Sequence, residues 1–226
     1  MTGAHLSGPG APTGLLGFAD VESLQDLSTY VARAKHLDAD GAIRLQAAGR
    51  VLAAWVRVLP GQGLLGHGLV LGLRTMPLER DHELDVTVPL SGLSDRFARR
   101  SAEGDTGTEI SVPPTTVNPP WAALTPPRTE WEPRATVASE TLIDVARESI
   151  DAVAQGTPQG AGAAAVAALR QRVWGADLPD VPAGTPRGVA FAAFSLGFAQ
   201  PGSEATILRH GPWTRVSLAG GHVLAR

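Results

Sequence analysis

The stretch from Ser23 to Leu59 constrains the fold most, because it joins a helical pattern directly to strand patterns. Apolar side chains recur every three or four residues at Val21, Leu24, Leu27, Val31, Ala34 and Leu37. This spacing predicts an amphipathic helix, and Asp20 or Ser23 supplies its N-cap oxygen. The turn from Asp38 to Gly41 ends the helix, because glycine adopts the positive φ that tight turns need.

Strand patterns follow this helix. Residues 42–47 alternate apolar and polar side chains, and residues 51–59 are apolar almost throughout. A turn centred on Gly49 separates these two strands, and further strands are predicted over 69–76 and 84–88. Short connections between them favour an antiparallel meander over parallel crossovers.

Residues 101–134 differ in composition from the rest of the chain. Proline pairs occur at Pro113–Pro114, Pro119–Pro120 and Pro126–Pro127, with Trp121 and Trp131 between or just after them. Proline disfavours both helix and central strand, so an extended strap is predicted. Large aromatic side chains in such a segment favour a strap that is pinned to the core. The alternative is a small-ligand pocket lined by Trp121 and Trp131.

The last part of the chain returns to helices and strands. Helices are predicted over 136–155, 163–174 and 187–198, and strands over 205–209, 213–218 and 222–225. The helix over 187–198 is apolar on nearly every side, so it is either buried or located at the interface of a homo-oligomer. The sequence therefore predicts an α+β fold in which helices pack on an antiparallel sheet.

Four segments make up the predicted organisation. Residues 1–16 are expected to be disordered, residues 17–100 form a helix and β-meander half, residues 101–134 form the strap, and residues 135–226 form a helical half ending in β-hairpins. Both halves contain a helix, a glycine-containing turn and short strands. This pattern suggests an internal duplication of an α-β-β-β unit, with both copies in one sheet.

Composition excludes several classes of function. The net charge of −3 gives no electrostatic attraction to nucleic acid or to anionic membranes. No segment has the apolar length of a membrane-spanning helix or a secretory signal, so a cytoplasmic location is expected. The absence of cysteine rules out disulfides, zinc–thiolate sites and cysteine nucleophiles.

No motif specifies a reaction or a cofactor. Residues 61–66 match the pattern G-x-G-x-x-G, but dinucleotide binding requires a helix to begin at the third glycine. The residues that follow predict a strand, which favours a flexible hairpin loop. The six histidines show no metal-ligand spacing, so no catalytic residue, metal site or cofactor is predicted.

Four motifs carry a resemblance to a known family. They are the sequence from Gly17 to Asp20, the helix and hairpin that follow it, the Pro-Pro-Trp at 119–121 and the Gly-Pro-Trp at 211–213. Together with the bias towards arginine, alanine and glycine, they resemble an uncharacterised family of conserved proteins from GC-rich actinobacteria. The resemblance implies no activity.

The densest cluster of candidate binding residues lies at the predicted hairpin turn around Gly211. Arg209, His210, Trp213 and Arg215 on an exposed turn favour the binding of an anion or of a partner's carboxylates. In the alternative interpretation, Trp213 packs inward and the arginines are solvated. The sequence thus predicts a non-catalytic protein-interaction or regulatory module. The alternative is a small-ligand-binding protein or an enzyme with a pocket beside the strap.

A DNA-binding function is a minor alternative. The three predicted helices over 136–155, 163–174 and 187–198, followed by a hairpin, imitate a winged helix-turn-helix, and residues 163–226 carry six arginines against three acidic residues. The helix that would enter the major groove is almost entirely apolar, whereas base edges are read by polar side chains. Nucleic acid is therefore an unlikely partner on the sequence alone.

Overall fold

A computed structural model describes residues 14–63, 65–157, 160 and 162–226. Its elements, in order, are β1 (Leu15–Gly17), α1 (Val21–Leu37), β2 (Ala42–Leu59), β3 (Val70–Pro89), α2 (Leu90–Glu103), β4 (Glu109–Ser111), the 3-10 turn η1 (Pro120–Ala123), β5 (Glu132–Ala138), α3 (Ser139–Gln155), α4 (Ala163–Gly175), α5 (Gly188–Ser195), β6 (Glu204–His210), β7 (Trp213–Leu218) and β8 (Gly221–Ala225). Of the N-terminal segment expected to be disordered, residues 1–13 lie outside the described residues. Leu15 and Leu16 belong to β1, which pairs with β4.

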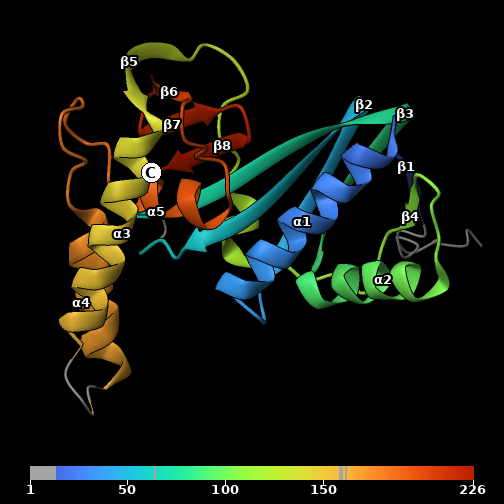
Figure 1. Cartoon of the computed structure of the whole chain (residues 1–226), viewed down its shortest axis with the longest axis horizontal. Coiled ribbons are helices and arrows are strands. Elements are labelled where there is room, and N and C mark those ends of the chain that lie inside the picture. Colours follow the sequence, from blue (N-terminus) through green and yellow to red (C-terminus); the bar gives the residue numbers. More distant parts are fainter. Residues whose placement is uncertain (1–13, 64, 158–159, 161) are drawn as a thin grey trace, which may run out of the picture.

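The main sheet has six strands in the order β2-β3-β8-β7-β6-β5, and every neighbouring pair is antiparallel. The first two strands come from the N-terminal half and the other four from the C-terminal half (Figure 1). Pro133 lies in the edge strand β5 at a register shift, where it removes no ladder hydrogen bond from the sheet interior. The predicted α+β fold with an antiparallel sheet is confirmed.

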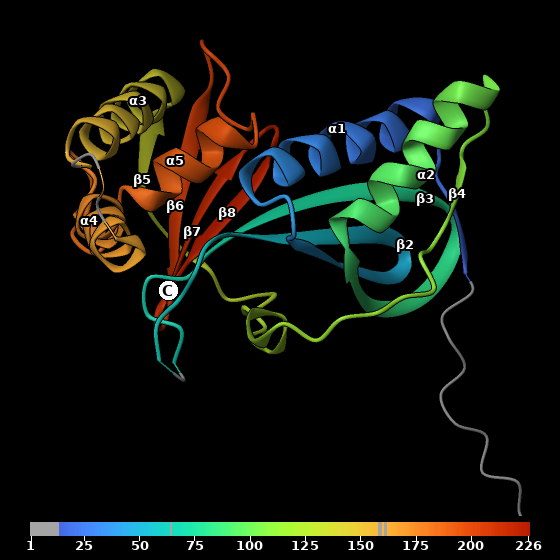
Figure 2. The same ribbon diagram turned by 90° about the horizontal axis from the view of Figure 1, so that it is seen from below.

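The N-terminal half contains two long strands where the sequence suggests four short ones. Residues 42–59 form one strand because Gly49, at φ +59°, makes a register shift and not a turn. A straight strand of this length would span about 60 Å. Asp38, before the strand, nevertheless forms an ion pair of 2.8 Å with Arg57 near its end. The β2–β3 ribbon therefore curls back on itself, as Figure 2 shows.

Helices pack on one face of the sheet. Figure 2 shows α5 over the C-terminal strands and α1 with α2 along the curled ribbon. Asp20 caps α1 by accepting a hydrogen bond of 2.7 Å from the Ser23 backbone amide. In α5, Val189, Ala190, Ala192 and Ala193 are fully buried. The apolar helix is therefore buried within the chain itself, which is one of its two predicted alternatives, and the burial does not require a second subunit.

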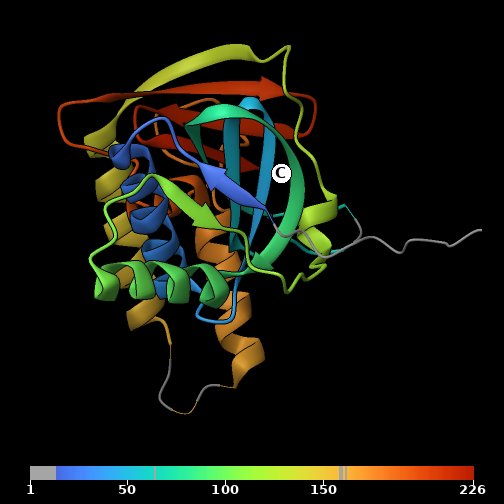
Figure 3. The ribbon, with the colours of Figure 1, turned by 90° about the vertical axis from the view of Figure 1, so that its right-hand side faces the viewer.

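The strap crosses the opposite face of the sheet. Trp121, within η1, is 6% exposed and packs with Leu71, Leu73 and Leu224 of the sheet. Arg44 of β2 fixes the same turn by donating a hydrogen bond of 2.6 Å to the Ala122 carbonyl oxygen. The prediction that Trp121 pins the strap is confirmed, and Figure 3 shows the strap running beside the ribbon towards β5.

The suggested duplication has a mixed outcome. Its strands lie in one sheet, as the hypothesis required. The repeat of three strands after a helix is wrong for the N-terminal half, because α1 is followed by two long strands before α2. The C-terminal half does place three short strands after α5. A superposable pair of units stays a prediction.

Candidate functional site

The structure separates the four residues predicted at the β6–β7 turn. Alternation along β7 places Trp213 and Arg215 on the strap face of the sheet, and Trp213 is only 4% exposed in the cluster that contains Trp121. The functional interpretation that exposed Trp213 to a partner is wrong, because the strap and the neighbouring strands cover its ring. Its inward-packing alternative is the observed one.

Arg209 turns away from the other three. Its Nη2 donates a hydrogen bond of 2.6 Å to the Ala183 carbonyl oxygen. It therefore supports the loop before α5. This loop, the end of α4 and the β6–β7 turn line a hollow of about 530 Å³, to which Pro212 and Thr214 contribute.

Arg215, His210 and Trp131 do come together. The Arg215 guanidinium carbon lies 5.0 Å from the centroid of the Trp131 ring, which is a cation–π distance. His210 meets the same ring edge-on at 6.0 Å between centroids, and its Nδ1 lies 3.0 Å from the Glu130 carbonyl oxygen. All three side chains are half-buried, so part of each remains open to solvent.

Two residues that were not predicted extend this cluster along the sheet. Arg215 Nε donates a hydrogen bond of 3.0 Å to Ser217 Oγ, and His222 Nδ1 lies 3.0 Å from the same oxygen. Ser217 is paired directly with His222 across β7 and β8. The alternation of residues 213, 215 and 217 identifies Ser217 as a neighbour of Arg215, whereas His222 follows only from the strand register. We call Trp131, His210, Arg215, Ser217 and His222 the Trp131 surface.

The Trp131 surface presents hydrogen-bond donors. Ser217 Oγ accepts from Arg215 Nε and has a second lone pair, so the tautomer of His222 decides whether Ser217 or His222 donates in their contact. Among the described residues, no carboxylate lies within ion-pair distance of Arg215. The surface therefore offers one uncompensated positive charge and donor groups to an anion.

Burial shifts the titration of both basic groups. Partial burial lowers the pKa of Arg215, but a guanidinium stays charged throughout the physiological range. The pKa of His222 is lowered first by burial and then by the positive charges of Arg215 and Arg74. His222 is consequently neutral at neutral pH.

Replacing His222 by glutamine is expected to reduce the loss of stability that the protein shows as the pH falls from neutral to acidic. The unfolded chain binds a proton near the ordinary pKa of 6.5 while the folded chain resists it, so stability is lost as the pH falls below that value. Melting temperatures of both proteins measured from about pH 7.5 to about pH 5 report the effect. Parallel curves would show that the environment of His222 does not disfavour its protonation.

The structure bears on two alternatives from the sequence analysis, the dinucleotide-binding loop and the DNA-reading helix. Gln62 and His67 form an isolated antiparallel bridge within the glycine loop, and strand β3 follows it, which confirms the hairpin interpretation of the G-x-G-x-x-G pattern. The DNA-reading role of α5 is wrong, because the centre of this helix is buried against the sheet. In the part of the chain that is described, no helix is both long and apolar enough to cross a membrane.

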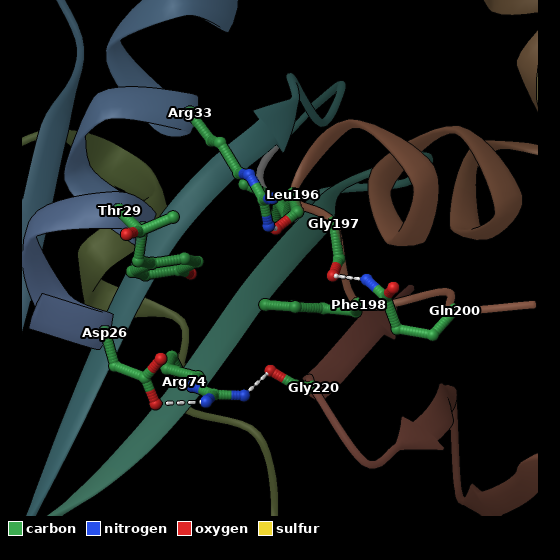
Figure 4. Close-up of a pocket in the computed structure, with 10 residues that line it drawn as sticks. Asp26, Thr29, Arg33, Arg74, Leu196, Gly197, Phe198, Gln200 and Gly220 are labelled. Atoms are coloured by element: carbon green, nitrogen blue, oxygen red, sulfur yellow. Dashed lines mark hydrogen bonds and ion pairs between the residues drawn. The ribbon is translucent and has the colours of Figure 1, made fainter. Parts of the chain in front are cut away.

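A second hollow lies on the helix-covered face, where the two halves meet. Its volume is about 220 Å³. Figure 4 shows Asp26 and Arg33 of α1 and Arg74 of β3 facing the segment after α5, from Leu196 to Gln200. No sequence pattern predicts this site, because its walls come from segments far apart in the chain.

Comparisons with known proteins define the chain at the level of domains. Residues 12–123 match a family described as "Domain of unknown function (DUF8010)", and residues 126–226 match one described as "Domain of unknown function (DUF8185)". The resemblance to an uncharacterised family is confirmed at this level. No curated protein matches the sequence.

Solved structures include a chain with a similar fold. It is described as a putative DNA polymerase III beta subunit from Eubacterium rectale, and it matches with a TM-score of 0.56 at 8% sequence identity. The match covers 94% of this chain and 64% of the other, so this chain corresponds to less than two thirds of that protein. At this identity the likeness concerns the fold alone.

Proposed function

We propose that the protein is a non-catalytic interaction module that binds an acidic segment of a partner protein through the Trp131 surface. The observation that carries the proposal is Arg215, a half-buried guanidinium stacked on Trp131 without a carboxylate partner among the described residues. A partner's aspartate or glutamate would supply the missing charge and use the free donors of Arg215.

The surface is already ordered before a partner arrives. Arg215 is held by Ser217 and by the Trp131 ring. Trp131 in turn donates from Nε1 to the Pro127 carbonyl oxygen at 3.0 Å. Binding therefore requires little further loss of side-chain entropy, which is the main cost of ordering arginine and tryptophan at an interface. Tryptophan and arginine are also the residues that most often dominate binding energy.

The similar solved structure supports an interaction role indirectly. It is described as a subunit, which is a chain that acts together with others. The sequence resemblance further suggests the cytoplasm of a GC-rich actinobacterium as the setting. The partner should therefore be sought in lysate from the organism that carries the gene.

Arg215→Ala and Trp131→Ala should each reduce recovery of the partner about tenfold, because one charge-assisted contact with its aromatic support is worth roughly 1.5–3 kcal/mol. The measurement is quantitative mass spectrometry of nuclease-treated pull-downs. Arg134→Ala is the matched control, since Arg134 is exposed on the edge strand β5 and pairs with Glu132.

Melting temperatures distinguish lost binding from lost folding. The Arg215 variant should melt close to the wild type, because it removes one partly exposed side chain. Recovery of the same partner with all three variants at wild-type levels would overturn the proposal. Loss that is equal in the Arg134 control would show a general charge effect and would overturn it as well.

A further inference from the structure

The hollow between α1 and the segment after α5 has an unbalanced charge. The charge of Arg74 is compensated, since Arg74 pairs with Asp26 and also donates to the Gly220 carbonyl oxygen, as drawn in Figure 4. Arg33 has a different environment. Its Nη1 donates to the Leu196 carbonyl oxygen at 2.9 Å, and among the described residues no carboxylate lies within ion-pair distance. The hollow therefore carries one uncompensated positive charge.

Gly197 gives the Arg33 guanidinium a flat support. A Cβ at this position would overlap the guanidinium, with Nη2 at 2.8 Å, and the φ of +70° also favours glycine. Arg33 therefore lies directly on bare backbone. The contact with Leu196 uses one donor, and guanidinium provides five in a planar fork. The remaining donors match the geometry of a carboxylate.

The rest of the hollow is suited to a short apolar group. Tyr30 and Phe198 stack with 5.8 Å between ring centroids and an interplanar angle of 17°. Both rings contribute to the lining. Gln200 holds the far wall by donating from Nε2 to the Gly197 carbonyl oxygen at 2.9 Å. A volume of about 220 Å³ admits a molecule of a few non-hydrogen atoms and excludes a nucleotide.

We propose that this hollow binds a small free carboxylate, whose carboxylate group meets Arg33 and whose short aliphatic chain lies against Phe198. The ligand would contact α1 from the N-terminal half and the 196–200 segment from the C-terminal half. It therefore adds a small-molecule site to the proposed interaction module, on the opposite face of the sheet from the Trp131 surface. The two sites are independent of each other and are tested separately.

Sodium butyrate is the probe for this site. A ligand with so few atoms is expected to bind with a Kd of about 1 mM. A hundredfold excess should then raise the melting temperature by about 5 °C relative to sodium chloride at the same ionic strength. Butanol, which has the same chain without the charge, should give no comparable rise. Inorganic phosphate serves as a second anion and separates carboxylate recognition from simple attraction of negative charge.

Arg33→Gln should weaken butyrate binding at least tenfold, because the amide keeps a donor for Leu196 but loses the charge. Arg99→Gln, an exposed arginine on α2, should bind as the wild type does. If the Arg33 variant folds poorly, amide NMR shifts of the wild-type protein decide the question. Butyrate should move the signals of Arg33, Gly197 and Gln200.

Three results would overturn the proposal. The first is the absence of any shift in these amide signals at 100 mM butyrate, a concentration about a hundredfold above the expected Kd. The second is an equal response to butyrate, butanol and phosphate. The third is unchanged binding by a folded Arg33→Gln protein.

Discussion

Trp213→Ala is expected to lower the free energy of unfolding by about 3–5 kcal/mol, which is the usual cost of removing a buried tryptophan. The Trp213 ring is 4% exposed and packs with Trp121, Leu71 and Leu224, while the Arg226 guanidinium carbon lies 5.6 Å from its centroid. Its removal would leave a cavity between the sheet and the strap. Denaturant unfolding, with the slope checked against the wild type, measures the loss.

Trp131→Ala provides the comparison for this result. Trp131 belongs to the same strap face but is half-buried, so its removal should cost only about 1 kcal/mol. The two variants thus separate a structural tryptophan from a surface one. Equal and small losses would show that the strap does not cover Trp213. A large loss of unfolding free energy for the Trp131 variant alone would show that the main contact between strap and sheet lies at Trp131 and not at η1.

The contrast between these tryptophans shows where local patterns stop being informative. The alternation in β7 predicts that residues 213, 215 and 217 share one face, and the structure agrees. It does not reveal which part of that face is covered. Coverage depends on where the strap crosses, and that is set by contacts such as Arg44 with Ala122, which are 78 positions apart in the sequence.

The same limit applies to Gly49. Glycine between two strand-like runs fits a hairpin turn and a bulge equally well. The outcome depends on the partner strand, where His82 pairs with Gly49 and Pro77 pairs with Val51, so that the ladder continues on both sides of the irregularity. By contrast, the N-cap of α1 depends on neighbouring residues alone, and the sequence is sufficient for it. The positive φ expected at Gly41 is wrong. Glycine fits there because a Cβ would lie only 2.9 Å from the Asp38 carbonyl oxygen and 3.0 Å from Leu90 Cδ1.

The sequence predicts the residues of one proposed site better than those of the other. The sequence points to Arg215 because arginine beside tryptophan is typical of binding surfaces, and to Trp131 as a large aromatic side chain in the strap. It does not point to Arg33 or Arg74, since each lies in an ordinary helix or strand pattern. Their significance arises only when α1 and the segment after α5 approach each other over the sheet. A glycine inside the strand pattern of β3, Gly72, is the one local sign of that approach.

Gly72→Ala is expected to destabilise the protein by about 1–3 kcal/mol, because the site has no room for a methyl group. A Cβ at Gly72 would overlap Leu196 Cδ1 and lie 2.9 Å from Tyr30 Oη and 3.3 Å from Val56 Cγ2. These neighbours come from the C-cap of α5, from α1 and from β2 respectively. The absence of a side chain therefore allows helices from both halves to reach the sheet at one point.

A double-mutant cycle with Leu196→Ala tests whether this contact is the cause. Leu196→Ala alone should cost about 2–5 kcal/mol as a core truncation, yet the double variant should lose less than the sum, because the smaller side chain makes room for the new methyl group. Gly175→Ala, where nothing lies within 4 Å of an added Cβ, should leave stability unchanged or slightly raised. If the two stability losses add exactly in the double variant, residues 72 and 196 do not interact, and Gly72 is not the point where the end of α5 contacts the sheet.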